Sequence, residues 1–241
     1  MPIQTLITQR LYQQAAEQIS GLIDSGEIAL GARLPPERDL AKLLGVSRPT
    51  VREAMIALEI AGRVEIRVGS GIYVKAPTKR LPSALSVRMD VGPSPFELLA
   101  ARMTLEGEIA AQAAERVTRP MLAEIEETLV GLQADLRRGD LGQQNDRLFH
   151  RLIADATGNS VLTNLVEQLW EGMFAPIFHN LSTHVGLPAN LKMTIADHER
   201  IFGALKPRDP VEARAAMRMH LQHVEEILQG ADDLADMQPL T

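Results

Sequence analysis

The segment between residues 33 and 74 constrains the fold of this chain most, because helix, glycine-turn and hairpin signals follow one another there in a fixed order. An apolar helical face over Leu11–Ser25 precedes it. The pair Pro35-Pro36 then starts a second helix, which Gly45 ends, and Ser47 is placed to cap a third. Two short helices that meet at a glycine turn are typical of a helix-turn-helix.

A hairpin signal follows the third helix. The segments Val64–Arg67 and Ile72–Val74 alternate like strands on either side of a turn that contains Gly69. One side of the third helix is apolar, and we expect Arg48 and Arg52 to point away from it. The pattern predicts a winged helix-turn-helix whose wing lies against the DNA backbone.

Three arginines of this segment, Arg38, Arg48 and Arg52, are candidates for DNA contact. A forked guanidinium can hold O6 and N7 of guanine together, or clamp a phosphate. Ser47 and Thr50 can contact phosphate at the start of the third helix, where the helix dipole favours an anion. Any single arginine is better explained as a solvated charge on an amphipathic helix, but the ordered set favours double-stranded DNA as a partner.

Two stretches resemble the GntR family of bacterial transcription regulators: Leu-Pro-Pro-Glu-Arg-Asp-Leu-Ala over residues 34–41 and Gly-Val-Ser-Arg-Pro-Thr-Val-Arg-Glu-Ala over residues 45–54. The resemblance implies contacts to bases or phosphates from Arg38, Arg48 and Arg52, to phosphates from Ser47 and Thr50, and to the minor groove from Gly69. Pro49 departs from the family pattern, because many members carry a hydrogen-bonding side chain at that position. We expect base preference to differ there.

Charge is divided unevenly along the chain. Residues 1–80 contain 11 of the 25 basic residues and 8 of the 31 acidic ones, so they carry a net charge of +3. The remaining 161 residues carry −9, which gives the whole chain its net charge of −6. A weakly basic DNA reader binds a single site poorly, which favours a homodimer on a palindromic operator.

The absence of cysteine excludes disulfides and thiolate metal sites. The N-terminus lacks a basic start followed by an apolar core, and no apolar run approaches the length of a membrane span. We therefore expect a cytoplasmic protein with no membrane partner.

The pattern along the chain divides it into two domains. We expect a winged helix-turn-helix domain over residues 1–75, a linker over 76–93, a helical domain over 94–230 and a frayed tail over 231–241. Beyond the linker, six helix signals with short connections predict an antiparallel bundle. The fold class is mainly α: an N-terminal winged helix-turn-helix followed by an all-α bundle.

Four ionisable side chains occupy inward positions of the predicted bundle. Asp146 and His150 share one helix face, one turn apart, while His198 and His220 lie on the apolar faces of later helices. A lone inward histidine is usually a hydrogen-bonded core residue. Together, one carboxylate and three neutral imidazoles are satisfied by a divalent metal ion, with positions left for water or an anion. His223, one turn from His220, is an alternative ligand.

A further inward pair, Arg102 and Glu106, lies one turn apart in the first helix of the bundle. One interpretation is an internal salt bridge. The other is that Arg102 clamps a carboxylate of a ligand held above the metal.

The order and helix placement of these residues resemble the FCD effector domain of the FadR-like branch of GntR regulators. The resemblance implies zinc as the metal at Asp146, His150, His198 and His220, with nickel or manganese as alternatives. It also implies a small carboxylic acid at Arg102 and Glu106. The tract Pro95–Arg102 looks most like members that respond to hexuronates and related sugar acids.

We therefore expect a transcription regulator, a repressor, whose operator binding is controlled by a small organic or sugar acid bound at the metal. The alternative is a metal-dependent hydrolase or lyase, because a cation with open positions can activate water. Hydrolytic metal sites normally keep a separate acid or base beside the metal, and the sequence offers only Glu106 as an inward candidate, which argues against an enzyme. A third class is an architectural DNA-binding protein with structural histidines.

Overall fold

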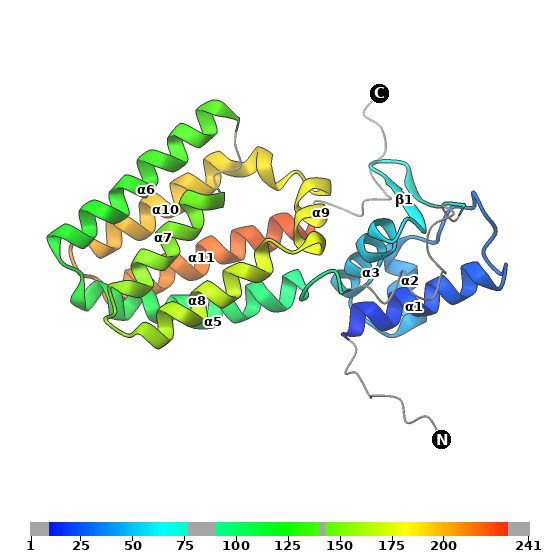
Figure 1. Cartoon of the computed structure of the whole chain (residues 1–241), viewed down its shortest axis with the longest axis horizontal. Coiled ribbons are helices and arrows are strands. Elements are labelled where there is room, and N and C mark those ends of the chain that lie inside the picture. The colour runs from blue at the N-terminus through cyan, green and yellow to red at the C-terminus, as the bar shows by residue number, and fades with distance from the viewer. Residues whose placement is uncertain (1–9, 77–89, 140–142, 231–241) are drawn as a thin grey trace, which may run out of the picture. The chain divides into compact units, whose positions relative to one another are not determined.

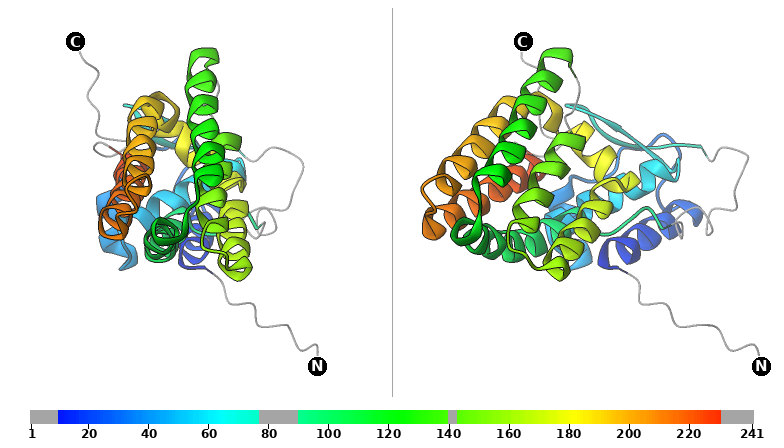
Figure 2. Two further views of the ribbon diagram at one scale, coloured as in Figure 1. Left: turned by 90° about the vertical axis from the view of Figure 1, so that its left-hand side faces the viewer. Right: turned by 60° about the vertical axis from the view of Figure 1, so that its left-hand side comes forward.

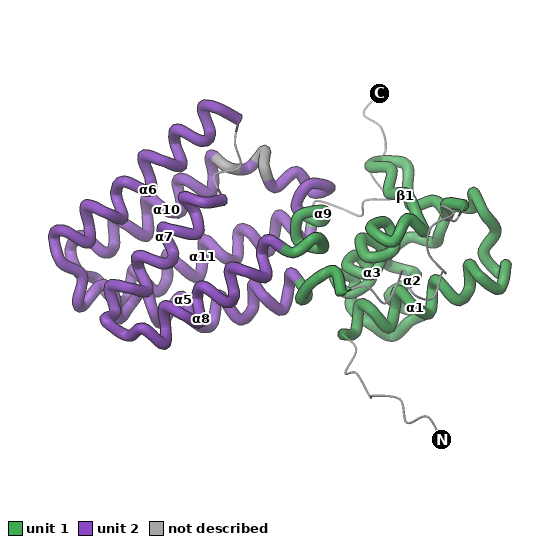
Figure 3. Tube along the Cα trace, in the orientation of Figure 1, with its two compact units in different colours: residues 1–94, 175–181, 230–241 green, residues 95–174, 182–229 purple. Residues whose placement is uncertain are grey.

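A computed structural model describes residues 10–76, 90–139 and 143–230. The chain divides into two compact units (Figure 3). Unit 1 comprises residues 1–94, 175–181 and 230–241, and unit 2 comprises residues 95–174 and 182–229. The expected tail over 231–241 and most of the expected linker lie outside the described residues.

Residues 10–76 of unit 1 form the helices α1 (Leu11–Asp24), α2 (Glu37–Leu44) and α3 (Arg48–Ile60), as the helix-turn-helix pattern predicts (Figure 1). Gly45 ends α2 in the left-handed region, at φ 67° and ψ 31°, which a glycine adopts without strain. Helix α1 packs on α3. Its buried face includes Tyr12, whereas Leu11, which the periodicity placed on that face, is exposed.

The predicted wing is the antiparallel hairpin of β1 (Val64–Arg67) and β2 (Gly71–Val74). Val64 pairs with Val74, and Ile66 with Ile72, and all four side chains are buried. The turn between the strands contains Gly69 at φ 73°. The prediction of a hairpin wing is therefore confirmed.

A short segment before the helical bundle, residues 90–94, is hydrogen-bonded to both α1 and α3 within unit 1. The Tyr12 hydroxyl donates to the carbonyl oxygen of Gly92 at 2.7 Å, and the Ser94 hydroxyl donates to Oε1 of Glu53. The backbone N–H of Ile177 donates to the carbonyl of Val91 at 3.0 Å. A stretch from far along the sequence, residues 175–181, therefore belongs to the same compact unit.

Unit 2 is a bundle of helices, as predicted, whose members lie against one another in Figures 1 and 2. Helix α5 packs along α11 and against α7 and α8, while α10 lies between α11 and α6. The helices are α5 (Pro95–Arg116), α6 (Arg119–Arg138), α7 (Gln143–Asp155), α8 (Ser160–Met173), α9 (Pro176–His184), η1 (Leu187–Asn190), α10 (Leu191–Leu205) and α11 (Pro210–Gln229). Helix α9 begins within the stretch assigned to unit 1.

The helix boundaries follow the sequence signals closely. Asp209 caps the start of α11, because its Oδ1 atom accepts the backbone N–H groups of Val211 and Glu212 at 3.0 Å each. Gly172 and Pro176 predict a break within residues 161–178, and α8 ends at Met173 there. Among the described residues, no helix combines the length and apolar character of a membrane span.

Candidate functional site

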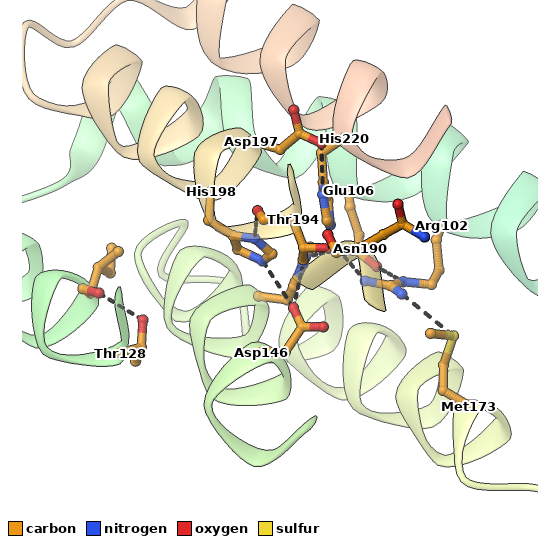
Figure 4. A network of polar contacts seen from close by, with 12 residues as sticks. Arg102, Glu106, Thr128, Asp146, Met173, Asn190, Thr194, Asp197, His198 and His220 are labelled. Atoms are coloured by element: carbon orange, nitrogen blue, oxygen red, sulfur yellow. Dashed lines mark hydrogen bonds and ion pairs between the residues drawn. The ribbon is translucent and has the colours of Figure 1, made fainter. Parts of the chain in front are cut away.

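The four predicted metal ligands converge in unit 2, and Figure 4 labels three of them, Asp146, His198 and His220. Asp146 and His150 come from α7, His198 from α10 and His220 from α11. One candidate ligand atom from each residue lies within 4.8 Å of the others. The amphipathic pattern of three helices therefore places one carboxylate and three imidazoles around one point.

The three imidazoles are buried, with 0 to 2% of each residue exposed, whereas 24% of the Asp146 side chain is exposed. The rings of His198 and His220 are 4.4 Å apart between centroids, and each lies 5.3 Å from the ring of His150. Phe149 stacks edge-on against His198 at 4.5 Å. The three histidines of the cluster are thus shielded from solvent, whereas Asp146 is partly exposed to it.

Each imidazole has an oxygen beside its Nδ1 atom. Nδ1 of His198 lies 2.6 Å from the carbonyl oxygen of Thr194, and Nδ1 of His150 is hydrogen-bonded to Oε2 of Glu106. Nδ1 of His220 faces Oδ2 of Asp197 at 3.8 Å. These contacts leave Nε2 of each ring for another partner.

The Nε2 atoms of His198 and His150, on the side of each ring opposite Nδ1, face Asp146. Its Oδ1 atom is 2.9 Å from Nε2 of His198 and 3.5 Å from Nε2 of His150. Nε2 of His150 is buried and has no hydrogen-bond partner among the described residues. A divalent cation near these atoms would satisfy the orphaned nitrogen, so the donor set fits a metal ion.

The alternative ligand His223 lies outside this cluster. Its Nδ1 atom is hydrogen-bonded to Oδ2 of Asp197 at 2.9 Å, on the outer side of His220. Asp197 therefore binds His223 and lies 3.8 Å from Nδ1 of His220. The alternative assignment of His223 as a substitute ligand is wrong for this arrangement.

Charges around the cluster shift its titrating groups. Burial opposes ionisation of Asp146, but His198 and His150 outweigh it and hold the pKa of Asp146 well below its usual range. Burial, together with repulsion from His198, lowers the pKa of His220 from 6.5 to about 3. A carboxylate and a neutral imidazole are the forms in which these side chains bind metals.

Arg102 and Glu106 form the internal ion pair that was one of the two sequence interpretations. Nε of Arg102 donates to Oε1 of Glu106 at 2.6 Å, and both side chains are buried. Burial raises the pKa of Glu106, but Arg102 and His150 outweigh burial and lower it to about 2. The pair joins the candidate metal cluster through the contact between Glu106 and His150.

Sequence reasoning missed two neighbours of this pair on α8. The indole ring of Trp170 lies beneath the guanidinium of Arg102, 4.4 Å from Cζ to the ring centroid, and 5.4 Å from the His150 ring. The sulfur of Met173 accepts a hydrogen bond from Nη1 of Arg102 at 3.4 Å. Both residues occupy apolar positions of an ordinary amphipathic helix, so the pattern contained no signal of a site.

The predicted DNA-reading residues are mostly on the surface of unit 1. Arg38, Ser47 and Arg48 are exposed. Oγ of Ser47 accepts the backbone N–H of Thr50 at 3.2 Å, which confirms Ser47 as the cap of α3. Gly69 lies in the turn of the wing.

Arg52 does not point outward, and that expectation is wrong. Its side chain is only 4% exposed, and its Nε and Nη2 atoms donate to the carboxylate of Glu37 on α2 at 2.9 to 3.2 Å. Burial of both charges is tolerated because the contact is bidentate. The pair fixes α3 against α2.

Comparison with protein families covers both units. A model of the FCD domain matches residues 97–223, and the model described as "Bacterial regulatory proteins, gntR family" matches residues 11–74. The first match contains the whole Asp146, His150, His198 and His220 cluster, and the second contains all the predicted DNA-reading residues.

Individual proteins align over nearly the full chain. The Uxu operon transcriptional regulator of Escherichia coli K12 is 38% identical over 236 residues, covering 95% of this chain and 91% of that protein. The Exu regulon transcriptional regulator of the same strain is 36% identical over 224 residues, covering 91% and 85%. The solved structure of E. coli McbR/YncC shares 28% identity and a TM-score of 0.50, covering 92% and 98%. The chain thus belongs to the GntR family of bacterial regulatory proteins with an FCD domain, and is a DNA-binding transcription regulator, not an enzyme.

Proposed function

We propose that this regulator is a repressor whose operator binding is controlled by a small carboxylic acid held at a metal ion in unit 2. The observation that carries the proposal is the cluster of Asp146, His150, His198 and His220, whose candidate ligand atoms lie within 4.8 Å of one another. Zinc suits three imidazoles and one carboxylate, and nickel and manganese are the alternatives. The metal would orient the acid and attract its negative charge.

Arg102 supplies a second contact for the acid in this proposal. Its Nη1 atom is hydrogen-bonded to the sulfur of Met173, which is a weak acceptor. A ligand carboxylate is a stronger partner for that N–H group, so it would displace the thioether. Glu106 would hold the other side of the guanidinium through the contact at Nε.

A sugar acid is the effector class that we propose. The tract Pro95–Arg102 resembles regulators that respond to hexuronates, and the relatives named above are regulators of the Uxu operon and the Exu regulon. A hexuronate has one carboxylate for Arg102 or the metal, and hydroxyl groups for the remaining coordination positions.

A homodimer on a palindromic operator is the proposed DNA-bound form. Two recognition helices α3 would enter successive major-groove turns, about 34 Å apart when half-sites are one helical turn apart. Arg38 and Arg48 would contact bases or phosphates, Ser47 and Thr50 would contact phosphates, and Gly69 would approach the minor groove. In this proposal Arg52 acts through Glu37 to hold α3, because its guanidinium is already engaged.

Trp170 makes the test direct, because it is the single tryptophan of the chain and lies against Arg102 and His150. Zinc-loaded protein would be titrated with a panel of hexuronates and other sugar acids while tryptophan fluorescence is followed. In parallel, binding to a DNA site that the protein selects from a random pool would be measured by fluorescence anisotropy. We expect one acid to change both signals at the same concentration.

The control is Asp146→Ala, compared with Asp155→Ala on the same helix. Asp146→Ala should lose stoichiometric zinc, measured by elemental analysis, and with it the response to acid, whereas Asp155→Ala should keep both. Unchanged DNA affinity at every acid in zinc-loaded protein would contradict the proposal.

A further inference from the structure

Glu106, which the sequence predicts to be a ligand-binding residue, also contacts His150 of the candidate metal cluster, on the side of the ring away from Asp146. Its Oε1 atom accepts from Nε of Arg102 at 2.6 Å, while Oε2 is hydrogen-bonded to Nδ1 of His150. Only 2% of its side chain is exposed. Each carboxylate oxygen therefore has a fixed partner, and one of these partners is a candidate metal ligand.

An imidazole can carry its proton on either nitrogen, and it binds a metal through the other. A carboxylate can only accept, so the contact with Glu106 requires the proton of His150 to be on Nδ1. The lone pair of Nε2 then points to the opposite side of the ring, where Asp146 Oδ1 lies 3.5 Å away. Metal-bound histidines commonly donate their second N–H to a carboxylate in this way.

We propose that Glu106 is a positioning residue for the metal: it holds His150 in the tautomer and orientation that present Nε2 to the ion. The inference rests on the metal centre proposed above. It changes the role of the Arg102 and Glu106 pair, because Glu106 acts on the metal through His150 and Arg102 holds Glu106 in place.

The other two histidines provide an internal comparison. Nδ1 of His198 faces a backbone carbonyl, that of Thr194, which no side-chain substitution removes. Nδ1 of His220 is 3.8 Å from Asp197, beyond hydrogen-bonding distance. Glu106 therefore makes the closest charged contact to a ligand ring, and its loss should affect metal binding more than loss of Asp197.

The test is a zinc titration of the full chain in competition with a chromogenic chelator. In E106Q the amide can donate to Nδ1 and favour the wrong tautomer, so we expect zinc affinity to fall by about 10 to 100-fold. D197N should show a smaller loss. The matched control is E108Q, on the outer face of the same helix, where the carboxylate pairs with Arg214 at 2.7 Å; it should bind zinc as the wild type does.

A second measurement separates positioning from a general loss of structure. In metal-free protein at alkaline pH, nitrogen NMR of His150 should report a proton on Nδ1 in the wild type and a shift toward Nε2 in E106Q. If E106Q does not fold because Arg102 is left unpaired, R102M/E106Q removes both charges and takes its place in both measurements.

The zinc titration and the NMR measurement separate failure of the proposed metal centre from failure of the proposed role of Glu106. Wild-type protein that binds no stoichiometric zinc, nickel or manganese would overturn the metal centre. Wild-type protein that binds zinc, together with an E106Q variant of equal affinity and unchanged tautomer, would overturn the role of Glu106 alone.

Discussion

Arg48 and Arg52 lie one turn apart on α3 and occupy opposite environments. Arg48 is exposed at the first turn, whereas Arg52 is enclosed and paired with Glu37. Helical spacing predicted that both side chains point outward, because the periodicity of one helix does not show which residues of α2 pack against it. The buried partner is visible only once the two helices are packed.

At the residue scale, we predict that Arg48→Ala weakens DNA binding and relaxes preference at one base pair of each half-site. The loss of a bidentate guanine contact corresponds to about 1 to 3 kcal/mol per half-site. Fluorescence anisotropy on the selected site and on single-base variants measures both effects. An equal loss on selected and random DNA would instead make Arg48 a phosphate contact.

The convergence of the four candidate metal ligands was predictable at this scale, and their outer hydrogen-bond partners were not. A histidine at an inward helical position stands out against an apolar face, as His198 and His220 do. Asp197, by contrast, follows Ala196 in a polar stretch and resembles a solvated charge. Its contact with His223 depends on how α10 packs against α11.

Single helices were predicted more reliably than their arrangement. Glycine, proline and capping residues fix where α3 and α11 begin, because these signals act within a few residues. The sequence also predicted the break before α9. It did not predict that residues 175–181 would join unit 1, because that contact brings together segments more than eighty residues apart.

At the element scale, the ion pair between α2 and α3 should control the stability of the recognition helix. Glu37→Ala leaves the buried guanidinium of Arg52 without its carboxylate, which we expect to cost about 3 to 5 kcal/mol of unfolding free energy. Chemical denaturation followed by circular dichroism measures the loss.

The double variant Glu37→Met with Arg52→Met removes both charges and should recover most of that stability. DNA binding by the refolded double variant then decides the role of Arg52. Retained affinity supports a positioning role, whereas a folded variant that no longer binds DNA would show that Arg52 itself contacts the nucleic acid.

At the scale of the whole molecule, the four candidate metal ligands all belong to unit 2. Removal of the metal should therefore destabilise the helices of unit 2 more than those of unit 1. Metal at a hundredfold excess over its dissociation constant stabilises the folded state by about 2.7 kcal/mol. We predict that zinc slows hydrogen exchange in α7, α10 and α11 and leaves α1 and α2 unchanged, as measured by mass spectrometry. Protection that rises equally in every helix, or in none, would contradict this.

The stretch over residues 175–181 has a consequence for protein engineering. In this chain Ala175 and Ile177 contact Gly92 and Val91. A chimaera that took only residues 1–94 from a relative would keep this chain's Ala175 and Ile177, which would then face the relative's residues at positions 91 and 92. Because Gly92 has φ 119° and no room for a side chain beside Ala175, a mismatch there would strain the joint. A functional hybrid of this regulator therefore has to transplant two separate pieces of sequence together.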